Sequence, residues 1–267
     1  MRLDGRRQSN NVDDRRGRGG IGGKLAGGGI VAVVVAAIFA WISGGNPLDV
    51  ITSQGGALLG GGSTQTEEYV PTEQEEELAV FARQILAGTE DVWSEIFRQN
   101  GLEYEPPKLV LFNGSVQSGC GGATSQTGPF YCSADRSVYL DLSFFTDMKR
   151  TLGADGDFAY AYVIAHEVGH HVQNLLGTLD QAHQQMARMS ETEANKISVR
   201  LELQADFYAG VWANHDNKRF NSLEPGDIEE ALDAASKIGD DYLQKRAQGY
   251  AVPDSFNHGT SAQREKW

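Results

Sequence analysis

Two histidines four residues apart, with a glutamate directly after the first, are the residues whose types and spacing best suit chemistry. They lie in the run His166-Glu167-Val168-Gly169-His170. On a helix, residues i and i+4 share one face, with Cβ atoms about 5–6 Å apart, so both imidazoles can bind one Zn²⁺. Glu167 then lies beside the metal and can act as the general base on a metal-activated water. The run therefore predicts the catalytic core of a zinc peptidase.

Two carboxylates further along the chain, Glu202 and Asp206, could complete this metal site. A catalytic zinc usually has three protein ligands and one open position. The two acids share a helix face and stand between apolar residues, where a carboxylate is costly to bury unless it meets a cation. We predict that Glu202 is the third metal ligand and that Asp206 accepts a hydrogen bond from the outer N–H of a ligating histidine. The alternative is a solvent-facing acidic stripe.

Hydrophobic periodicity predicts the elements that must position these groups. The zinc run falls in a predicted helix over 158–176, and the two acids fall in a predicted helix over 190–214. Further helices are predicted over 73–98 and 225–246, and short strands over 108–112, 129–132 and 137–142. This pattern predicts a helix-dominated α+β domain over 71–267, and the zinc run within it resembles that of zincin-like metallopeptidases.

An apolar run near the N-terminus predicts a membrane anchor. No charged residue occurs between Lys24 and Asp49, and the run with its flanking glycines has about the twenty residues that span a bilayer. We predict one transmembrane helix over 27–45, in contact with lipid. Residues 1–26 are basic, so the positive-inside rule predicts a cytoplasmic head, followed outside by a flexible linker over 46–70. The alternatives are a cleaved signal peptide and a buried core helix.

The charge of the chain bears on its partners. The net charge is −13, although the N-terminal residues are basic. Phosphate binding needs a basic patch, so an acidic body argues against nucleic acid as a partner.

Two cysteines, Cys120 and Cys132, fall in the part predicted to lie outside the cytoplasm. In an oxidising compartment an even number of cysteines favours a disulfide. Free thiols and metal ligands are the alternatives.

Several longer stretches extend the pattern and resemble a known family. HEVGHHVQN followed by ELQADFYAG resembles the gluzincin arrangement, in which a helical Glu is the third ligand and an Asp four residues later supports a ligand. More closely, MRLDGRRQSNNVDDRRG, GPFYCSADRSVYLDLSFF and the C-terminal HGTSAQR resemble the bacterial neutral zinc metallopeptidases over nearly the whole chain. The resemblance implies a zinc cofactor and a peptidase tethered to the inner membrane. Phe207 departs from the family, where Cys is common, and this leaves Cys120 and Cys132 as the only pair.

Peptide hydrolysis also needs a donor to the developing oxyanion. Because thermolysin-like enzymes use a C-terminal histidine, the resemblance implies His258 as the second catalytic group. Tyr208, Arg264 and Tyr131 are alternative donors, and His258 could instead be a structural histidine. His171 is expected to face away from the metal, because neighbours in sequence do not share a helix face.

The sequence is consistent with two functions. The first is an active peptidase whose peptide or protein substrate lies extended along an edge strand within residues 130–142. The second is a catalytically inactive zinc-binding adaptor on a peptidase scaffold. All the groups needed for hydrolysis are present, which favours the first.

Overall fold

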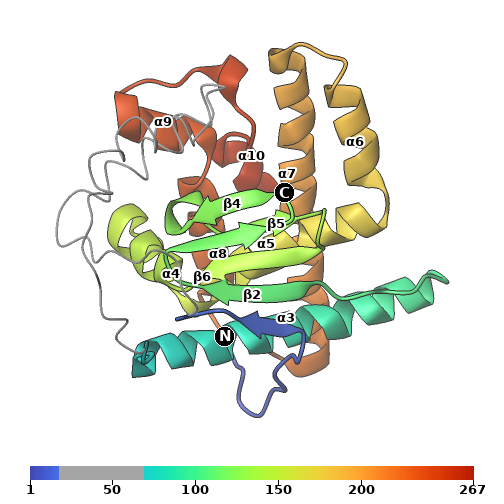
Figure 1. The fold of residues 1–267 in the computed structure, drawn as a ribbon, viewed down its shortest axis with the longest axis vertical. Helices are drawn as coiled ribbons and strands as arrows, with labels where there is room; N and C mark the ends of the chain where they lie inside the picture. The colour runs from blue at the N-terminus through green and yellow to red at the C-terminus, as the bar shows by residue number, and fades with distance from the viewer. Residues whose placement is uncertain (18–68) are drawn as a thin grey trace.

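The computed structural model describes residues 1–17 and 69–267. It has the predicted helix-dominated α+β fold, in which helices lie behind a mixed four-stranded sheet in the view of Figure 1. Helix α5 (Asp157–Leu175) packs against the sheet and against two later helices, α7 (Glu191–Phe220) and α8 (Asp227–Lys237). The main apolar core lies where these elements meet, and it places α5, which carries the zinc run, at the centre of the molecule.

The sheet has one edge strand next to α5. In spatial order its strands are β1 (Val12–Asp14), β2 (Lys108–Phe112), β6 (Ser137–Asp141) and β5 (Phe130–Cys132). β1, β2 and β6 are parallel, and β5 runs antiparallel to β6. All five residues of β6 are buried, whereas β5 forms the edge of the sheet. A separate hairpin joins β3 (Ser115–Ser118) to β4 (Gly121–Thr124).

The remaining helices of the described residues are mostly short. They are α3 (Glu73–Gln99), α4 (Ser143–Asp147), α6 (Thr178–Met186), α9 (Asp240–Gln248), α10 (Ser261–Lys266), the π-helix Met148–Leu152 and the 3₁₀ turns Ser125–Thr127 and Pro253–Ser255. The predicted helices over 73–98 and 158–176 are confirmed, and the one over 190–214 continues to Phe220. Thr72 and Glu75 form a capping box that starts α3.

The predicted single helix over 225–246 is wrong, because the chain bends between α8 and α9. The bend contains Gly239, where a Cβ atom would lie 2.3 Å from the backbone nitrogen of Ser261. The C-terminal segment therefore packs directly onto this glycine. Such a contact joins segments far apart in the sequence, so periodicity does not reveal it.

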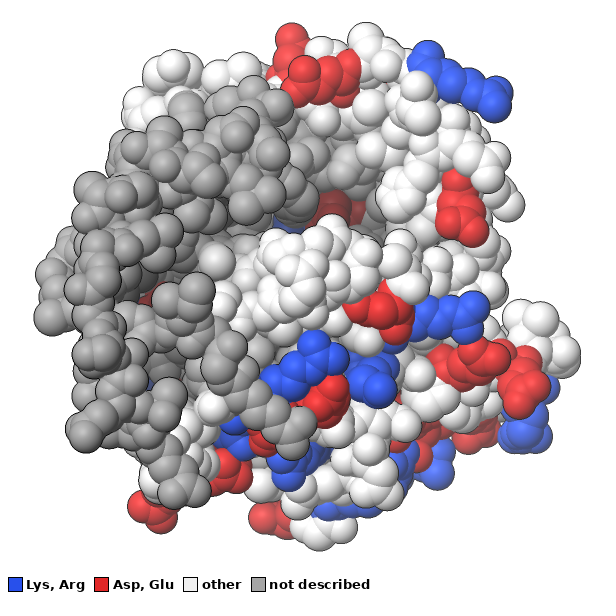
Figure 2. Space-filling model, in the orientation of Figure 1, with Lys and Arg blue, Asp and Glu red and all other residues white. Residues whose placement is uncertain are grey.

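Residues 1–17 belong to this fold and so do not form a separate basic head, whereas residues 18–26 of the predicted head lie outside the described residues. β1 is a strand of the same sheet as β2. Arg6 bonds the buried Asp216 of α7 at 2.6 Å, and the Arg6 side chain is itself only 10% exposed. Figure 2 shows basic and acidic side chains interleaved over the lower part of the face, near the N-terminal segment and α3. The arginines are neutralised by acids of the same fold.

This packing also corrects the predicted membrane topology. A strand cannot lie across a bilayer from the sheet that it belongs to, so residues 1–17 and the domain lie on one side. Gly17 and Tyr69 are in contact, which brings the two described parts of the chain together. A cytoplasmic N-terminus with the catalytic domain outside is therefore incompatible with this structure.

The predicted transmembrane helix over 27–45 lies outside the described residues, as does the linker up to residue 68. Within residues 1–17 and 69–267, no helix combines the length and the apolar character that a membrane crossing requires. Contact of 27–45 with lipid stays a prediction.

Candidate metal centre

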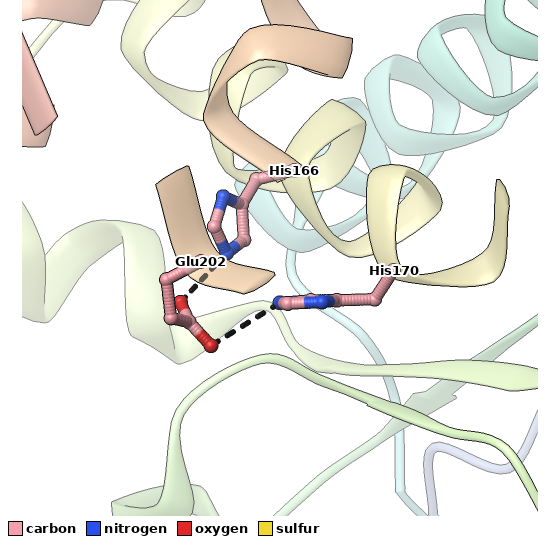
Figure 3. A group of neighbouring side chains, drawn as sticks. All are labelled: His166, His170 and Glu202. Atoms are coloured by element: carbon pink, nitrogen blue, oxygen red, sulfur yellow. Dashed lines mark ion pairs between the residues drawn. The ribbon is translucent and has the colours of Figure 1, made fainter. Parts of the chain in front are cut away.

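The zinc run and the predicted third ligand meet where α5 crosses α7. His166 and His170 project from one face of α5, and Glu202 points toward them from α7 (Figure 3). The Nε2 atom of His166 lies 3.2 Å from one carboxylate oxygen of Glu202, and Nε2 of His170 lies 3.4 Å from the other. The structure thus brings together the three residues that the sequence singled out as metal ligands.

A glycine inside the zinc run allows the two helices to approach. A Cβ atom on Gly169 would lie 2.9 Å from the carbonyl oxygen of Ala205 in α7. Any larger residue would push α7 away from α5. Because Glu202 is carried by α7, the small residue between the two histidines sets the distance from which the third ligand reaches the site.

The outer nitrogen of His166 is held by a buried cluster. Its Nδ1 donates to Asp206 at 2.7 Å, as predicted. Asp206 also accepts from the Tyr162 hydroxyl at 2.6 Å and from two nitrogens of Arg264 at 2.9 and 2.8 Å. Because Nδ1 keeps its hydrogen for Asp206, Nε2 is the nitrogen of His166 that faces Glu202 and that would bind a metal after losing its own proton. Arg264 therefore lies behind the candidate metal ligands and supports Asp206, away from the position that an oxyanion donor would take.

The second histidine has a partner that sequence reasoning missed. Nδ1 of His170 bonds the side-chain oxygen of Gln173 at 2.9 Å, and the amide nitrogen of Gln173 donates to the carbonyl oxygen of Leu201 at 2.7 Å. Gln173 is fully buried. Its position three residues after His170 on the same helix is a signal that could have identified it.

The electrostatics of the three ligands favour a bound cation. Burial opposes protonation of His166, but the Asp206 carboxylate outweighs it and raises the pKa of the imidazole to about 10. Burial also opposes ionisation of Glu202, yet the nearby His170 and His166 hold the pKa of this carboxyl well below its usual range. Surroundings of this kind stabilise positive charge between the three side chains, carried by protons or by a divalent metal.

The donor set fits zinc in type and in spacing. Two imidazole nitrogens and one carboxylate form a ligand set found in catalytic zinc sites. Ligands at 2.0–2.1 Å from a tetrahedral ion lie about 3.3–3.4 Å from one another. The separations of 3.2 and 3.4 Å between Glu202 and the two histidines agree with this geometry.

Glu167 has the properties of a general base. It is buried beside the three ligands, and burial raises the pKa of its carboxyl above the ordinary value. A carboxylate with a raised pKa accepts a proton more readily at neutral pH than an exposed one.

His258 lies near the candidate metal ligands. Its charge is close enough to Glu202 to contribute to the low pKa of that carboxyl. Nδ1 of His258 bonds the fully buried Asp240 at 3.1 Å, and Asp240 also accepts from the backbone nitrogens of His258 and Gly259. Burial lowers the pKa of His258, but Asp240 and Glu202 together outweigh it, so the net shift of the pKa is upward. The sequence did not identify Asp240.

The other donors considered from the sequence lie elsewhere. Tyr208 packs against the ring of Trp93 in α3, with 5.4 Å between ring centroids. Tyr131 bonds His171 at 2.9 Å, and His171 faces the sheet, as expected. Neither contact involves a metal ligand.

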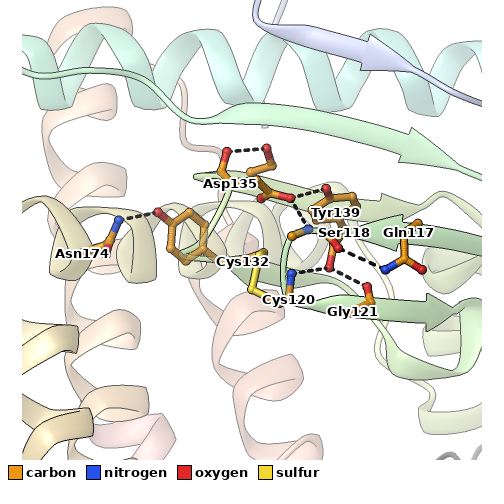
Figure 4. Close-up of a disulfide and its surroundings, with 11 residues drawn as sticks. Gln117, Ser118, Cys120, Gly121, Cys132, Asp135, Tyr139 and Asn174 are labelled. Carbon is orange, nitrogen blue, oxygen red and sulfur yellow. Dashed lines mark hydrogen bonds between the residues drawn. A yellow bond between two sulfur atoms is a disulfide. The ribbon is translucent and has the colours of Figure 1, made fainter.

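The predicted disulfide between Cys120 and Cys132 is confirmed. It joins the turn before β4 to the last residue of β5, with 5.8 Å between the Cα atoms (Figure 4). It thus links the hairpin to the edge strand of the sheet.

Arg264→Lys is expected to weaken zinc binding about tenfold or more, because lysine cannot donate two parallel hydrogen bonds to Asp206 and second-layer partners have effects of this size. Zinc affinity is measured by titration against a competing chelator. The matched control is Arg246→Lys. Arg246 is exposed, and its side chain donates a hydrogen bond to the backbone oxygen of Thr151. An unchanged affinity in Arg264→Lys would show that Asp206 is held without the guanidinium.

Comparison with known proteins gives the family. The whole chain, residues 1–267, matches the family described as "Putative neutral zinc metallopeptidase". It is 48% identical over 275 residues to the uncharacterized protein YpfJ of Escherichia coli K12. This alignment covers 100% of this chain and 93% of the relative. It is 45% identical over 174 residues to the uncharacterized protein Rv2575 of Mycobacterium tuberculosis, which covers 61% of this chain and 58% of the relative.

No solved structure matches the chain. The match over the full length agrees with the geometry of the two histidines and the glutamate. This chain belongs to the neutral zinc metallopeptidase family.

Proposed function

We propose that this chain is an active zinc-dependent peptidase. The observation that carries the proposal is the meeting of His166, His170 and Glu202 at separations suited to one zinc ion, with Glu167 buried beside them. When bound, zinc lowers the pKa of a water molecule and polarises the scissile carbonyl. The family description supports the same reaction class.

The protein groups divide the proton transfers between them. Glu167 takes a proton from the attacking water while the water oxygen bonds to the carbonyl carbon of the substrate. The bond between that carbon and the amide nitrogen then breaks, and Glu167 gives the proton to the departing amine. His258, held by Asp240 and with a raised pKa, donates to the oxygen on which negative charge develops.

The strand order of the sheet supports β5 as the strand along which an extended substrate binds. The predicted edge strand within 130–142 resolves into β5 and β6, and β6 is wrong for this role because it is buried between β2 and β5. β5 lies at the sheet edge and contacts α5. A peptide that adds to β5 as a further strand would therefore run past the zinc helix.

Metal removal tests the proposal. Cleavage of a mixed peptide library is followed by mass spectrometry for the full chain as purified, after chelation, and after zinc is restored. We expect cleavage to disappear on chelation and to return with zinc. Cleavage that persists without metal would contradict the mechanism. Stoichiometric zinc binding without cleavage of any peptide would instead favour the inactive adaptor.

A further inference from the structure

Each residue of the edge strand β5 is anchored, but only one is anchored to the zinc helix. The Phe130 ring stacks on Tyr139 of β6 with 4.8 Å between centroids. Cys132 is bonded to Cys120 in the neighbouring hairpin. These two contacts hold β5 within the sheet layer. Tyr131 is the residue between them, and its hydroxyl reaches α5.

Two side chains of α5 hold that hydroxyl. His171 lies 2.9 Å from it through Nδ1, and Asn174 donates to it at 3.0 Å, as Figure 4 shows for Asn174. Nε2 of His171 lies 2.7 Å from the carbonyl oxygen of Glu105, which can only accept, so Nε2 carries the hydrogen. In the neutral ring Nδ1 is then an acceptor. The Tyr131 hydroxyl therefore donates to His171 and accepts from Asn174, and both of its hydrogen-bonding functions are used.

His171 and Asn174 lie close to the candidate metal ligands on α5. His171 directly follows the ligand His170, and Asn174 is one helical turn further on. His171 is fully buried, and Tyr131 is partly buried. A hydrogen bond between rigid elements fixes their separation more strictly than apolar packing does, because its length and direction are narrowly defined. The position of β5 relative to the metal ligands is thus set through Tyr131.

We propose that His171 and Asn174 are positioning residues, which hold β5 through the Tyr131 hydroxyl at the place where an extended peptide pairs with it beside the metal site. This inference rests on the proposed peptidase function. It assigns to the second histidine of the His170-His171 pair a role in substrate binding. The residues act on the substrate through β5 and do not touch the reacting atoms.

Tyr131→Phe removes only the hydroxyl and is the variant that tests this role. We expect KM for an extended peptide to rise about tenfold, the effect of losing about one buried hydrogen bond, while kcat stays within about twofold because ground state and transition state lose the same binding. The zinc affinity should not change. The matched control is Tyr139→Phe on the neighbouring strand β6, which removes a hydroxyl that donates to Asp135 in the turn before β6 and should leave KM unchanged.

A second measurement keeps the test independent of turnover. The Kd of a fluorescent peptide is measured in the Glu167→Gln background with and without Tyr131→Phe, and we expect it to rise by the same factor. If Tyr131→Phe changes neither the KM nor the Kd, the proposal is overturned and the contact is purely structural. A fall in kcat at unchanged KM would overturn it differently, by showing that Tyr131 touches the reacting atoms. If the wild type cleaves no peptide, the peptidase proposal fails, and the Kd comparison still decides the role of Tyr131.

Discussion

Glu167→Gln is expected to lower kcat for peptide cleavage by about 10²–10⁴-fold, the range attributed to general acid–base groups, and to leave zinc bound. Glutamine has the same shape but cannot accept the proton of the attacking water. The three ligands are separate side chains, so zinc content should stay at one per chain. Because Glu167 is buried and its pKa is raised by burial, the neutral amide should not destabilise the fold.

The measurements are cleavage of an identified peptide, zinc content by elemental analysis, and the midpoint of thermal unfolding. The control is Glu191→Gln, at an exposed position in the first turn of α7, which should behave as the wild type. Cleavage by Glu167→Gln at the wild-type rate would mean that another group accepts the proton. Loss of zinc from this variant would mean that Glu167 acts at the metal site as a ligand.

Glu202→Ala is expected to lose zinc, in contrast to Glu167→Gln, and to lose activity as a consequence. Two histidines alone provide fewer ligands than the three of a catalytic site. The zinc affinity should fall by more than about a hundredfold, beyond the range seen when second-layer partners are removed. Chelator titration gives the affinity, and the Co²⁺-substituted protein gives an absorption spectrum that reports the geometry of the ligands.

Asp206→Asn is the comparison that ranks the two carboxylates. Its amide oxygen can still accept from Nδ1 of His166, so zinc should bind more weakly than in the wild type but more tightly than in Glu202→Ala. If Glu202→Ala keeps tight zinc binding while Asp206→Asn loses it, the third ligand would be Asp206, and the arrangement in Figure 3 would not be the one that holds the metal.

The sequence alone determined the parts of the site that depend on local geometry. The spacing of His166 and His170 on a regular helix places both imidazoles on one face, whatever the rest of the chain does. The same holds for Glu202 and Asp206 on α7. The bounds of α3 and α5 also followed from nearby capping and periodicity. In each case the interacting residues are within a few positions of one another, so the local sequence pattern is enough to predict the helix face and the helix bounds.

The tertiary structure decided which distant groups complete the site. Arg264 reaches Asp206 across 58 positions, and Tyr131 reaches His171 across 40. The approach of α7 to α5 depends on Gly169, whose small size matters only because Ala205 packs against it. Contacts of this kind depend on how helices and strands pack, and no periodicity in the chain encodes them.

The N-terminal residues show the same limit most clearly. A basic segment before an apolar run reads as a membrane orientation signal when only the sequence is considered. In the fold, Arg6 pairs with Asp216, 210 positions away, and β1 joins the sheet. The sign of a charge can be read from the sequence, but its partner can be read only from the packed structure. The sequence thus predicted the candidate metal ligands of this protein, and the tertiary structure decided what supports them and where residues 1–17 lie.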